Sequence, residues 1–435
     1  MVWNKRFECM SLDELQSFQL EKLRETVGWV SDRVPFYRKK FEEAGITQND
    51  ILSVDDISKL PFTEKNDLRD NYPFAMCAVP MDQVIRVHAS SGTTGKPVTG
   101  PYTESDVDQW AECVARNLWS YGVRNEDILQ NSYGYGLFTG GLGLHQGAGL
   151  IKCTVVPTSS GLTERQINVL KDFGSTVLSS TPSYALTIAE RAEEMNIDIR
   201  KLPLRLGIFG AEPWTDEMRK EVEERMGIRA MDIYGLTELC GPGVAYDCDE
   251  QSGMHINEDH FIAEIVDPLS LEPVEPGEKG ELVFTAIQRR AMPLIRYRTK
   301  DITRLTRQEC SCGRTFVKMD RISGRTDDML IISGVNVFPS QVESLLLDIE
   351  EVEPQYRLVV RKSGYLDRLA VQVEAKKEVF GQGKAKLYEV EAKIIAHIRG
   401  NMGIGVDVEI MEPKSITRSE GKAVRVIDER PRKMV

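Results

Sequence analysis

Apolar, strand-like runs alternate with amphipathic, helix-like stretches from about residue 84 to residue 240, and this alternation limits the fold more than any other feature. Thr176–Ser180, for example, predicts a strand, and Pro182–Met195 predicts the helix that follows it. Such alternation is typical of α/β layers whose parallel strands are joined by crossover helices. Residues 12–46 upstream predict helices with an interruption at Pro35.

The pattern changes twice further along the chain, which is long enough at 435 residues for two or three domains. Residues 255–325 read as short strands and turns, which predicts a small β subdomain. After Arg325, helices and strands predict a separate α+β unit of about 110 residues. We therefore expect an α/β protein with a large multilayer N-terminal domain, 1–325, built on parallel sheets, and a smaller, mobile α+β C-terminal domain, 326–435.

Composition excludes several classes of protein. Hydrophobic residues make up 41% and charged residues 28% of the chain, which is ordinary for a globular protein. The net charge of −12 argues against a nucleic-acid or anionic-membrane partner. No secretory segment and no run of roughly 18 apolar residues is visible. The eight cysteines are mostly scattered, which favours a reducing, cytoplasmic location.

A loop rich in hydroxyls and glycines lies between His88 and Val98. Its candidate ligand-binding residues are Ser90, Ser91, Gly92, Thr93, Thr94, Gly95 and Lys96. The glycines permit a tight turn, while the hydroxyls, N–H groups and lysine can surround phosphate oxygens. Pro97 stands where a Walker A loop has Ser or Thr, so the loop is not of that type. Taken alone, it is equally consistent with a solvated turn.

Five further segments give the loop its weight because they follow it in a fixed order. They are Gly210-Ala-Glu-Pro213, Tyr234-Gly-Leu-Thr-Glu238, Tyr297-Arg-Thr-Lys-Asp301, Gly324-Arg-Thr-Asp-Asp328 and Arg418-Ser-Glu-Gly-Lys422. Over almost the whole chain, this series resembles the adenylate-forming superfamily of acyl-CoA synthetases, luciferases and adenylation domains. The segments Asn131–Gly143 and Gly210–Trp214 look most like phenylacetate–CoA ligases. One departure is that Lys96-Pro-Val-Thr99 lacks the second lysine that many members have after the proline.

The resemblance implies that the chain activates a carboxylic acid with ATP to an acyl-adenylate and then transfers the acyl group to coenzyme A. Two anions meet in the first step, so the site must supply positive charge and oriented dipoles. Lys422 is expected to bridge carboxylate and phosphate, Thr237 to bind the α-phosphate and Glu238 to hold Mg²⁺. The loop 90–96 is expected to hold the β- and γ-phosphates.

The same resemblance assigns the nucleoside and the second half-reaction. The adenine is expected between Tyr234 and the backbone of Gly210, Ala211, Glu212 and Pro213, and the ribose on Asp301 with support from Arg325. Asp232 and Gly235 complete the expected nucleotide site. Rotation of the C-terminal domain about Asp327 would bring the segment containing Gly334 to a channel for the CoA thiol. A homodimer is expected from the resemblance alone.

The acid is predicted to be an aryl monocarboxylate. Tyr135, Phe138 and Gly141 lie in a glycine-rich run in which aromatic side chains can line a flat slot for a ring. Ala211 and Gly235 are also expected to contact the acid, and Trp214, beside the predicted adenine loop, is expected to cap the other side of the slot. Packing of these aromatic residues in an ordinary core is the competing interpretation.

A second kind of site is predicted from cysteines. Cys310-Ser-Cys312-Gly313 places two thiols in one turn, and Cys248 and His255 lie together upstream. Because both segments flank the predicted β subdomain, these four residues are expected to form a closed, structural Zn²⁺ site. Two unrelated loops with free thiols are the alternative.

Two other functions fit the same residues. One is a relative that adenylates another acceptor without CoA, as deazaflavin-adenylating synthetases do. The other is a nucleotide-binding protein that has lost catalysis, although the joint presence of Lys422, Glu238 and Asp301 speaks against it.

Overall fold

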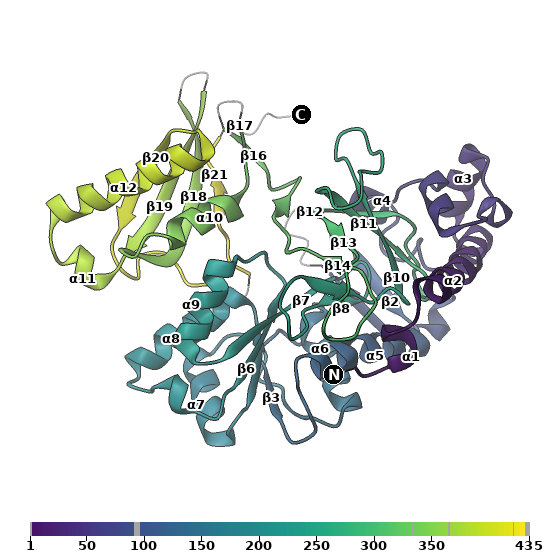
Figure 1. Ribbon diagram of the computed structural model, residues 1–435, viewed down its shortest axis with the longest axis horizontal. Helices are drawn as coiled ribbons and strands as arrows, with labels where there is room; N and C mark the ends of the chain where they lie inside the picture. The colour runs from purple at the N-terminus through teal and green to yellow at the C-terminus, as the bar shows by residue number, and fades with distance from the viewer. Residues whose placement is uncertain (1, 91–95, 333–334, 364–365, 421, 431–435) are drawn as a thin grey trace. The chain divides into compact units, whose positions relative to one another are not determined.

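The computed structural model describes residues 2–90, 96–332, 335–363, 366–420 and 422–430 (Figure 1). Six of the predicted site residues lie outside these ranges: Ser91, Gly92, Thr93, Thr94, Gly95 and Gly334. The chain forms two compact units. The first contains Met1–Ser180, Arg200–Ala211 and Ile228–Arg321, and the second contains Thr181–Ile199, Glu212–Gly227 and Ile322–Val435. The predicted boundary after residue 325 and the hinge at Asp327 stay predictions.

A mixed sheet of nine strands, counted over the described residues, forms the centre of the first unit, in the order β13-β14-β9-β8-β7-β6-β5-β3-β4. Its strands are β3 (Ile128–Asn131), β4 (Thr154–Val156), β5 (Val177–Ser180), β6 (Leu206–Gly210), β7 (Arg229–Leu236), β8 (Gly241–Tyr246), β9 (Met254–Ile256), β13 (Leu305–Thr306) and β14 (Lys318–Met319). Strands β4, β3, β5, β6 and β7 are parallel, as the alternation predicts. On the other side of β7, the neighbouring strands β8, β9, β14 and β13 pair antiparallel in that order.

The helices of this unit are α1 (Lys5–Glu8), α2 (Leu12–Arg33), α3 (Pro35–Ala44), α4 (Lys65–Asp70), α5 (Glu104–Ser120), α6 (Gly140–Leu150) and α7 (Thr163–Phe173). Helices α5 and α6 lie side by side against β8 (Figure 1). The predicted interruption at Pro35 is confirmed. Val34 is extended there, because the residue before a proline is forced out of the helical region, and Pro35 then starts α3.

Two smaller sheets complete the first unit. Strands β1 (Arg86–Ala89) and β2 (Thr99–Tyr102) form an antiparallel hairpin around the predicted phosphate loop. Strands β10 (Phe261–Val266), β11 (Gly280–Ala286) and β12 (Tyr297–Thr303) are antiparallel neighbours. Most of the predicted β subdomain is therefore found in β10 to β12, while β9, β13 and β14 extend the large sheet.

The second unit contains α8 (Pro182–Glu194), α9 (Asp216–Met226), β15 (Gly324–Arg325), β16 (Leu330–Ile332), β17 (Val335–Val337), α10 (Pro339–Leu347), β18 (Val352–Ser363), β19 (Leu366–Ala375), α11 (Lys377–Phe380), α12 (Lys384–Met402), β20 (Val406–Met411) and β21 (Val426–Asp428). Helices α10 and α12 pack on the sheet β20-β19-β18-β21. Their apolar stripes, including Leu346 and Ile394, close a core with Leu358 and Val371. This confirms the predicted small α+β unit near the C-terminus. Among the described residues, no helix is both long and apolar enough to cross a membrane.

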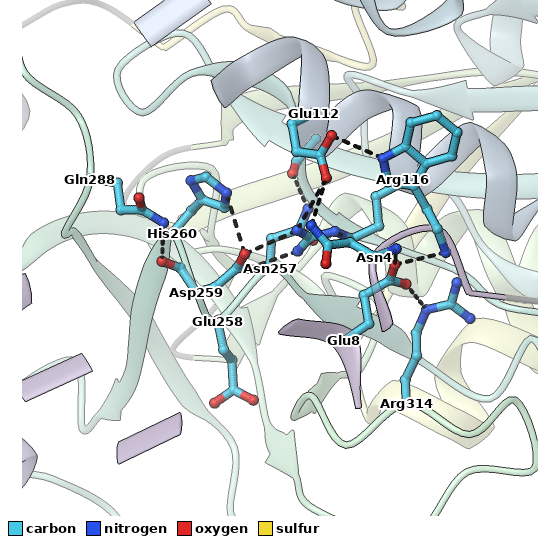
Figure 2. Close-up of polar contacts among 12 residues, drawn as sticks. Asn4, Glu8, Glu112, Arg116, Asn257, Glu258, Asp259, His260, Gln288 and Arg314 are labelled. Atoms are coloured by element: carbon cyan, nitrogen blue, oxygen red, sulfur yellow. Dashed lines mark hydrogen bonds and ion pairs between the residues drawn. The ribbon is translucent and has the colours of Figure 1, made fainter. Parts of the chain in front are cut away.

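A buried charge network crosses the core of the first unit (Figure 2). Arg116 of α5 is fully buried and donates two hydrogen bonds to the Asp259 carboxylate, at 2.7 and 3.0 Å. Burial raises the pKa of Asp259, but Arg116 and His260 outweigh this effect and hold it below its usual range. Glu8 of α1 lies on the other side of Arg116, with Oε1 3.8 Å from Nε, so the network fixes the N-terminal segment to the sheet.

Candidate active site

The stem of the predicted phosphate loop is a closed hairpin. Ser90 Oγ accepts a hydrogen bond from the backbone N–H of Val98 at 2.9 Å, and the Ser90 N–H donates to the carbonyl of Val98 at 2.9 Å. Lys96 is exposed just before this closure. The hairpin therefore fixes both ends of the loop, whose residues 91–95 lie outside the described ranges.

Asp301 on β12 and Tyr234 on β7 belong to different sheets, but their side chains are in direct contact. The Tyr234 hydroxyl donates to Oδ2 of Asp301 at 2.6 Å, and only 4% of Asp301 is exposed. Lys300 has a φ of 68°, which interrupts the regular β12 strand immediately before Asp301. A left-handed residue within a strand changes the direction of the next side chain, and here it precedes the predicted ribose acceptor.

The tip of the β7–β8 hairpin carries Thr237 and Glu238, both buried. The Leu239 N–H donates to the Leu236 carbonyl at 3.1 Å and closes the turn. Lys65, at the start of α4, lies with Nζ 3.3 Å from Oε1 of Glu238. Sequence reasoning did not select Lys65, because nothing in the local sequence shows which distant carboxylate it meets.

Close backbone approach explains the glycines of two motifs. A Cβ on Gly210 would lie 2.1 Å from the Ile233 carbonyl oxygen, and one on Gly235 would lie 1.8 Å from that of Gly241. Ala211 has a φ of 71°, a conformation that costs a non-glycine residue about 1 kcal/mol or more. Such stored strain is typical of ligand sites and supports the prediction for this loop.

Asp232 is held beneath this loop on β7. Its N–H donates to Oδ2 of Asp247 at 2.9 Å, and its carbonyl accepts from the Tyr121 hydroxyl at 2.7 Å. Its carboxylate lies 3.9 Å from Nε of Arg321. Asp232 is thus a buried anchor of the strand that leads to Tyr234.

The predicted aryl residues surround the start of α6. The Tyr135 hydroxyl accepts from Nδ2 of Asn131 at 2.8 Å and lies 3.2 Å from Nδ1 of His145. A Cβ on Gly141 would lie 2.5 Å from the Gly134 carbonyl oxygen and 3.0 Å from the Tyr135 ring. A Cβ on Gly140 would likewise lie 2.6 Å from the Phe138 ring. These contacts bring the aromatic side chains and the glycine helix together.

The helix start also meets the Tyr-Gly-Leu-Thr motif. Gly241 would place a Cβ 2.6 Å from Thr139, at the beginning of α6, and its carbonyl oxygen is the atom that approaches Gly235. The predicted acid slot and the predicted α-phosphate turn therefore converge on Gly241.

The second unit contains four of the described residues predicted to act at the nucleotide site: Glu212, Pro213, Arg325 and Lys422. Glu212 accepts from the N–H of Ser183 at 2.8 Å and from the N–H of Ala423 at 2.9 Å. The exposed Lys422 precedes Ala423, and its carbonyl accepts from the Ser419 hydroxyl at 2.7 Å. Arg325 forms a two-point ion pair with Asp327, at 2.9 and 3.1 Å.

The lysine loop has a strong anchor within the second unit. The Arg418 guanidinium donates to both carboxylate oxygens of Glu190, each at 2.8 Å, and to those of Glu374, at 2.7 and 2.9 Å. Glu374 is fully buried and also accepts from the backbone N–H groups of Lys414 and Ile416. The backbone on either side of Arg418 is therefore well fixed, while Lys422 itself stays exposed.

The four predicted metal ligands form one cluster. All their ligand atoms lie within 4.8 Å of one another. Sγ of Cys248 lies 3.6 Å from Sγ of Cys310, and Sγ of Cys312 lies 3.4 Å from Nε2 of His255. The prediction that these residues meet in space is confirmed.

Comparison with known proteins decides the family. Residues 33–288 match the model of the AMP-binding enzyme family and residues 334–430 that of the AMP-binding enzyme C-terminal domain. The phenylacetate-coenzyme A ligase of Thermus thermophilus is 47% identical, over 98% of this chain and 99% of the relative. That of Escherichia coli is 49% identical, over 97% and 96%. The chain belongs to the phenylacetate–CoA ligase family of AMP-binding enzymes.

A solved structure extends the match to the fold. The crystal structure of 2-hydroxyisobutyryl-CoA ligase in complex with 2-HIB-AMP matches with a TM-score of 0.94 at 29% identity, covering 99% of this chain and 92% of that chain. The predicted α/β class and the resemblance to phenylacetate–CoA ligases are thus confirmed. The members of this family are AMP-forming acid–CoA ligases. The prediction of an enzyme is therefore confirmed over the alternative of a non-catalytic nucleotide-binding protein.

Proposed function

We propose that this protein converts phenylacetate, ATP and CoA to phenylacetyl-CoA, AMP and pyrophosphate. The identity of 47–49% over nearly the whole chain to phenylacetate-coenzyme A ligases carries the proposal. The aromatic side chains of Tyr135 and Phe138 at the start of α6 support an aryl acid, because a flat ring packs well against such side chains.

In the first half-reaction, a carboxylate oxygen of the acid attacks the α-phosphorus of ATP, and the bond to the pyrophosphate oxygen breaks. We assign Lys422 to neutralise the approaching anions and Thr237 to bind the α-phosphate. Asp301 accepts the ribose hydroxyls with support from Arg325. Its hydrogen bond from Tyr234 already orients the carboxylate for this role.

The adenine is assigned to the space between Tyr234 and the backbone of Gly210 to Pro213, and the β- and γ-phosphates to the loop 90–96. Glu238 is the residue that fits Mg²⁺, because its buried carboxylate is a hard oxygen ligand at the same turn as Thr237. When bound there, the cation would offset phosphate charge.

In the second half-reaction, the CoA thiol attacks the acyl carbon and AMP leaves. Following the family pattern, we propose that the C-terminal domain turns about Asp327 and that the segment with Gly334 then borders the thiol channel. The exposed position of Lys422 is compatible with a side chain that serves one half-reaction only.

We further propose that Cys248, His255, Cys310 and Cys312 hold one structural Zn²⁺. Two thiolates bound at 2.3 Å in a tetrahedron lie about 3.8 Å apart, close to the observed 3.6 Å. Nδ1 of His255 faces the Phe316 carbonyl at 3.0 Å, which leaves Nε2 directed at the cluster. Four protein ligands leave no position for substrate, so the metal would stabilise the fold only.

A panel of acids tests the function. Pyrophosphate release is measured with phenylacetate, benzoate, 2-hydroxyisobutyrate and acetate, each with and without CoA. We expect the highest kcat/KM with phenylacetate and AMP formation that depends on CoA. Adenylation that leaves the acyl group on an acceptor other than CoA would establish the rival activity instead.

A further inference from the structure

A buried arginine, Arg289, forms hydrogen bonds to the tip of the β7–β8 hairpin. Nη1 of Arg289 donates to the carbonyl of Glu238 at 2.8 Å and also to the carbonyl of Leu239. These two carbonyls belong to the turn that presents Thr237 and Glu238. Because the guanidinium holds the carbonyl oxygens on its own side, they point away from any anion bound at the opposite face of the turn.

The same guanidinium is hydrogen-bonded to β2, the strand that follows the predicted phosphate loop in the sequence. Nη2 of Arg289 donates to the carbonyl of Pro101 on β2 at 3.0 Å. The neighbouring Gly100 packs directly on the turn, since a Cβ there would lie 3.2 Å from the Thr237 carbonyl oxygen and 3.4 Å from Nη2 of Arg289. Arg289 therefore joins the 237–239 turn to the strand that follows the predicted phosphate loop.

Arg289 is itself rigidly placed. It is only 7% exposed, and its guanidinium carbon lies 4.4 Å from the centre of the Tyr102 ring, within cation–π range. The preceding residue, Gln288, is held as well: its Nε2 donates to the Asp259 carbonyl at 2.6 Å (Figure 2). The Arg116–Asp259 ion pair thus supports the backbone from which Arg289 extends.

We propose that Arg289 is a positioning residue for adenylate formation. It holds the 237–239 turn and strand β2 in one arrangement, so that Thr237 and Glu238 are correctly placed for ATP. The inference rests on the proposed phosphate and Mg²⁺ roles of Thr237 and Glu238. Five fixed donors on a planar group suit a clamp on several carbonyls better than a single ammonium does.

The test compares Arg289→Met and Arg289→Lys with a matched control, Arg290→Met. Arg290 is the next residue, but its side chain is 43% exposed and lies over Trp29. Two half-reactions are measured: ATP–pyrophosphate exchange with phenylacetate, and thioester formation from synthetic phenylacetyl-AMP and CoA. Thermal unfolding midpoints are measured in parallel.

We expect Arg289→Met to lower kcat of the exchange reaction by about tenfold to a hundredfold, because small displacements of positioning groups have such effects. Thioester formation should fall by no more than about threefold, since only the α-phosphate contact remains in that step. Arg289→Lys should recover part of the lost rate, and Arg290→Met should behave as the wild type does.

Equal losses in both half-reactions, together with a lower unfolding midpoint, would overturn the proposal and make Arg289 a structural residue. Unchanged exchange in Arg289→Met would overturn it as well. If Arg289→Met does not fold, Gly100→Ala perturbs the same junction and must show the same split between half-reactions. A wild-type protein inactive with every acid refutes the proposed function instead, because that result appears before any variant is compared.

Discussion

Nζ of Lys65 lies 3.3 Å from Oε1 of Glu238, which joins the start of α4 to the tip of the β7–β8 hairpin. The Glu238 side chain is only 6% exposed, whereas that of Lys65 is 37% exposed. A buried carboxylate gains from a neighbouring cation, and lysine can leave such a position more easily than a buried arginine because its stem is flexible. The pair therefore places a competing cation beside the proposed Mg²⁺ ligand.

Replacing Lys65 should alter the metal dependence of adenylation. In Lys65→Met, Mg²⁺ no longer competes with an ammonium group for Glu238. The Mg²⁺ concentration for half-maximal pyrophosphate exchange should then fall by roughly twofold to fivefold, the range for partly exposed ion pairs. Lys39→Met is the control, since that side chain is 78% exposed and pairs with Glu43, on the same helix. An unaltered Mg²⁺ titration in Lys65→Met would separate the ion pair from the metal site.

The hydrogen bond between Tyr234 and Asp301 predicts a graded loss of ATP affinity. Asp301→Ala removes a charged acceptor and should raise KM for ATP by about tenfold to a hundredfold. Tyr234→Phe keeps the ring for the adenine and should raise it only a few-fold. Measured together, the two changes should be non-additive, because the residues are in direct contact. Additive effects, or Asp301→Ala with wild-type ATP binding in calorimetry, would leave Asp301 as a strand residue only.

Local patterns predicted those parts of this molecule that are fixed locally. Pro35 breaks a helix through its own ring, and the Cys310–Gly313 turn brings two thiols together within four residues. The partners of β9, β13 and β14 were not predictable, because strand pairing is decided between distant segments. Lys65 and Arg289 were missed for the same reason: each acts through a contact with the β7–β8 turn that no spacing in the sequence shows.

Lys422→Ala should separate the half-reactions. Only adenylation must bring two anions together, so loss of the ammonium should lower pyrophosphate exchange by roughly a hundredfold, or about 3 kcal/mol. Thioester formation from synthetic phenylacetyl-AMP should remain near the wild-type rate. Lys377→Ala, an exposed change on α11, serves as the control. Similar damage to both steps would show that Lys422 supports the fold or both reactions.

Glu343 of α10 predicts how the stability of the second unit depends on pH. Burial raises its pKa from the ordinary 4.5 to about 7, although Arg425 acts in the opposite direction. Because the pKa of Glu343 is higher in the folded state than in the unfolded state, the folded state binds this proton more tightly. The contribution of this proton to the free energy of unfolding is complete below pH 4.5 and is lost as the pH rises through about 7. The free energy of unfolding changes by about 3 kcal/mol over this interval.

Glu343→Gln should therefore raise the unfolding midpoint relative to the wild type at pH 8 more than at pH 5. Glu389→Gln, on the exposed face of α12, should show no such pH-dependent difference. If the wild type and Glu343→Gln lose stability in parallel between pH 5 and pH 8, Glu343 does not titrate in that interval.

The zinc proposal predicts that metal content and stability change together. Purified protein should contain about one Zn²⁺ per chain, and Cys312→Ser should lower both zinc content and the unfolding midpoint, because binding energy at a structural site is also folding energy. Loss of the 310–313 turn should also expose the N-terminal segment to proteases, since Arg314 donates to Glu8 at 2.6 Å and Thr315 donates to the Met10 carbonyl at 2.7 Å.

KM for the acid should hardly change in Cys312→Ser, because Tyr135 and Phe138 come from other segments. Cys77→Ser is the matched control, as Cys77 lies outside the cluster. Zinc-free protein of full stability, with Cys310 and Cys312 open to a thiol reagent, would reduce the cluster to two neighbouring loops.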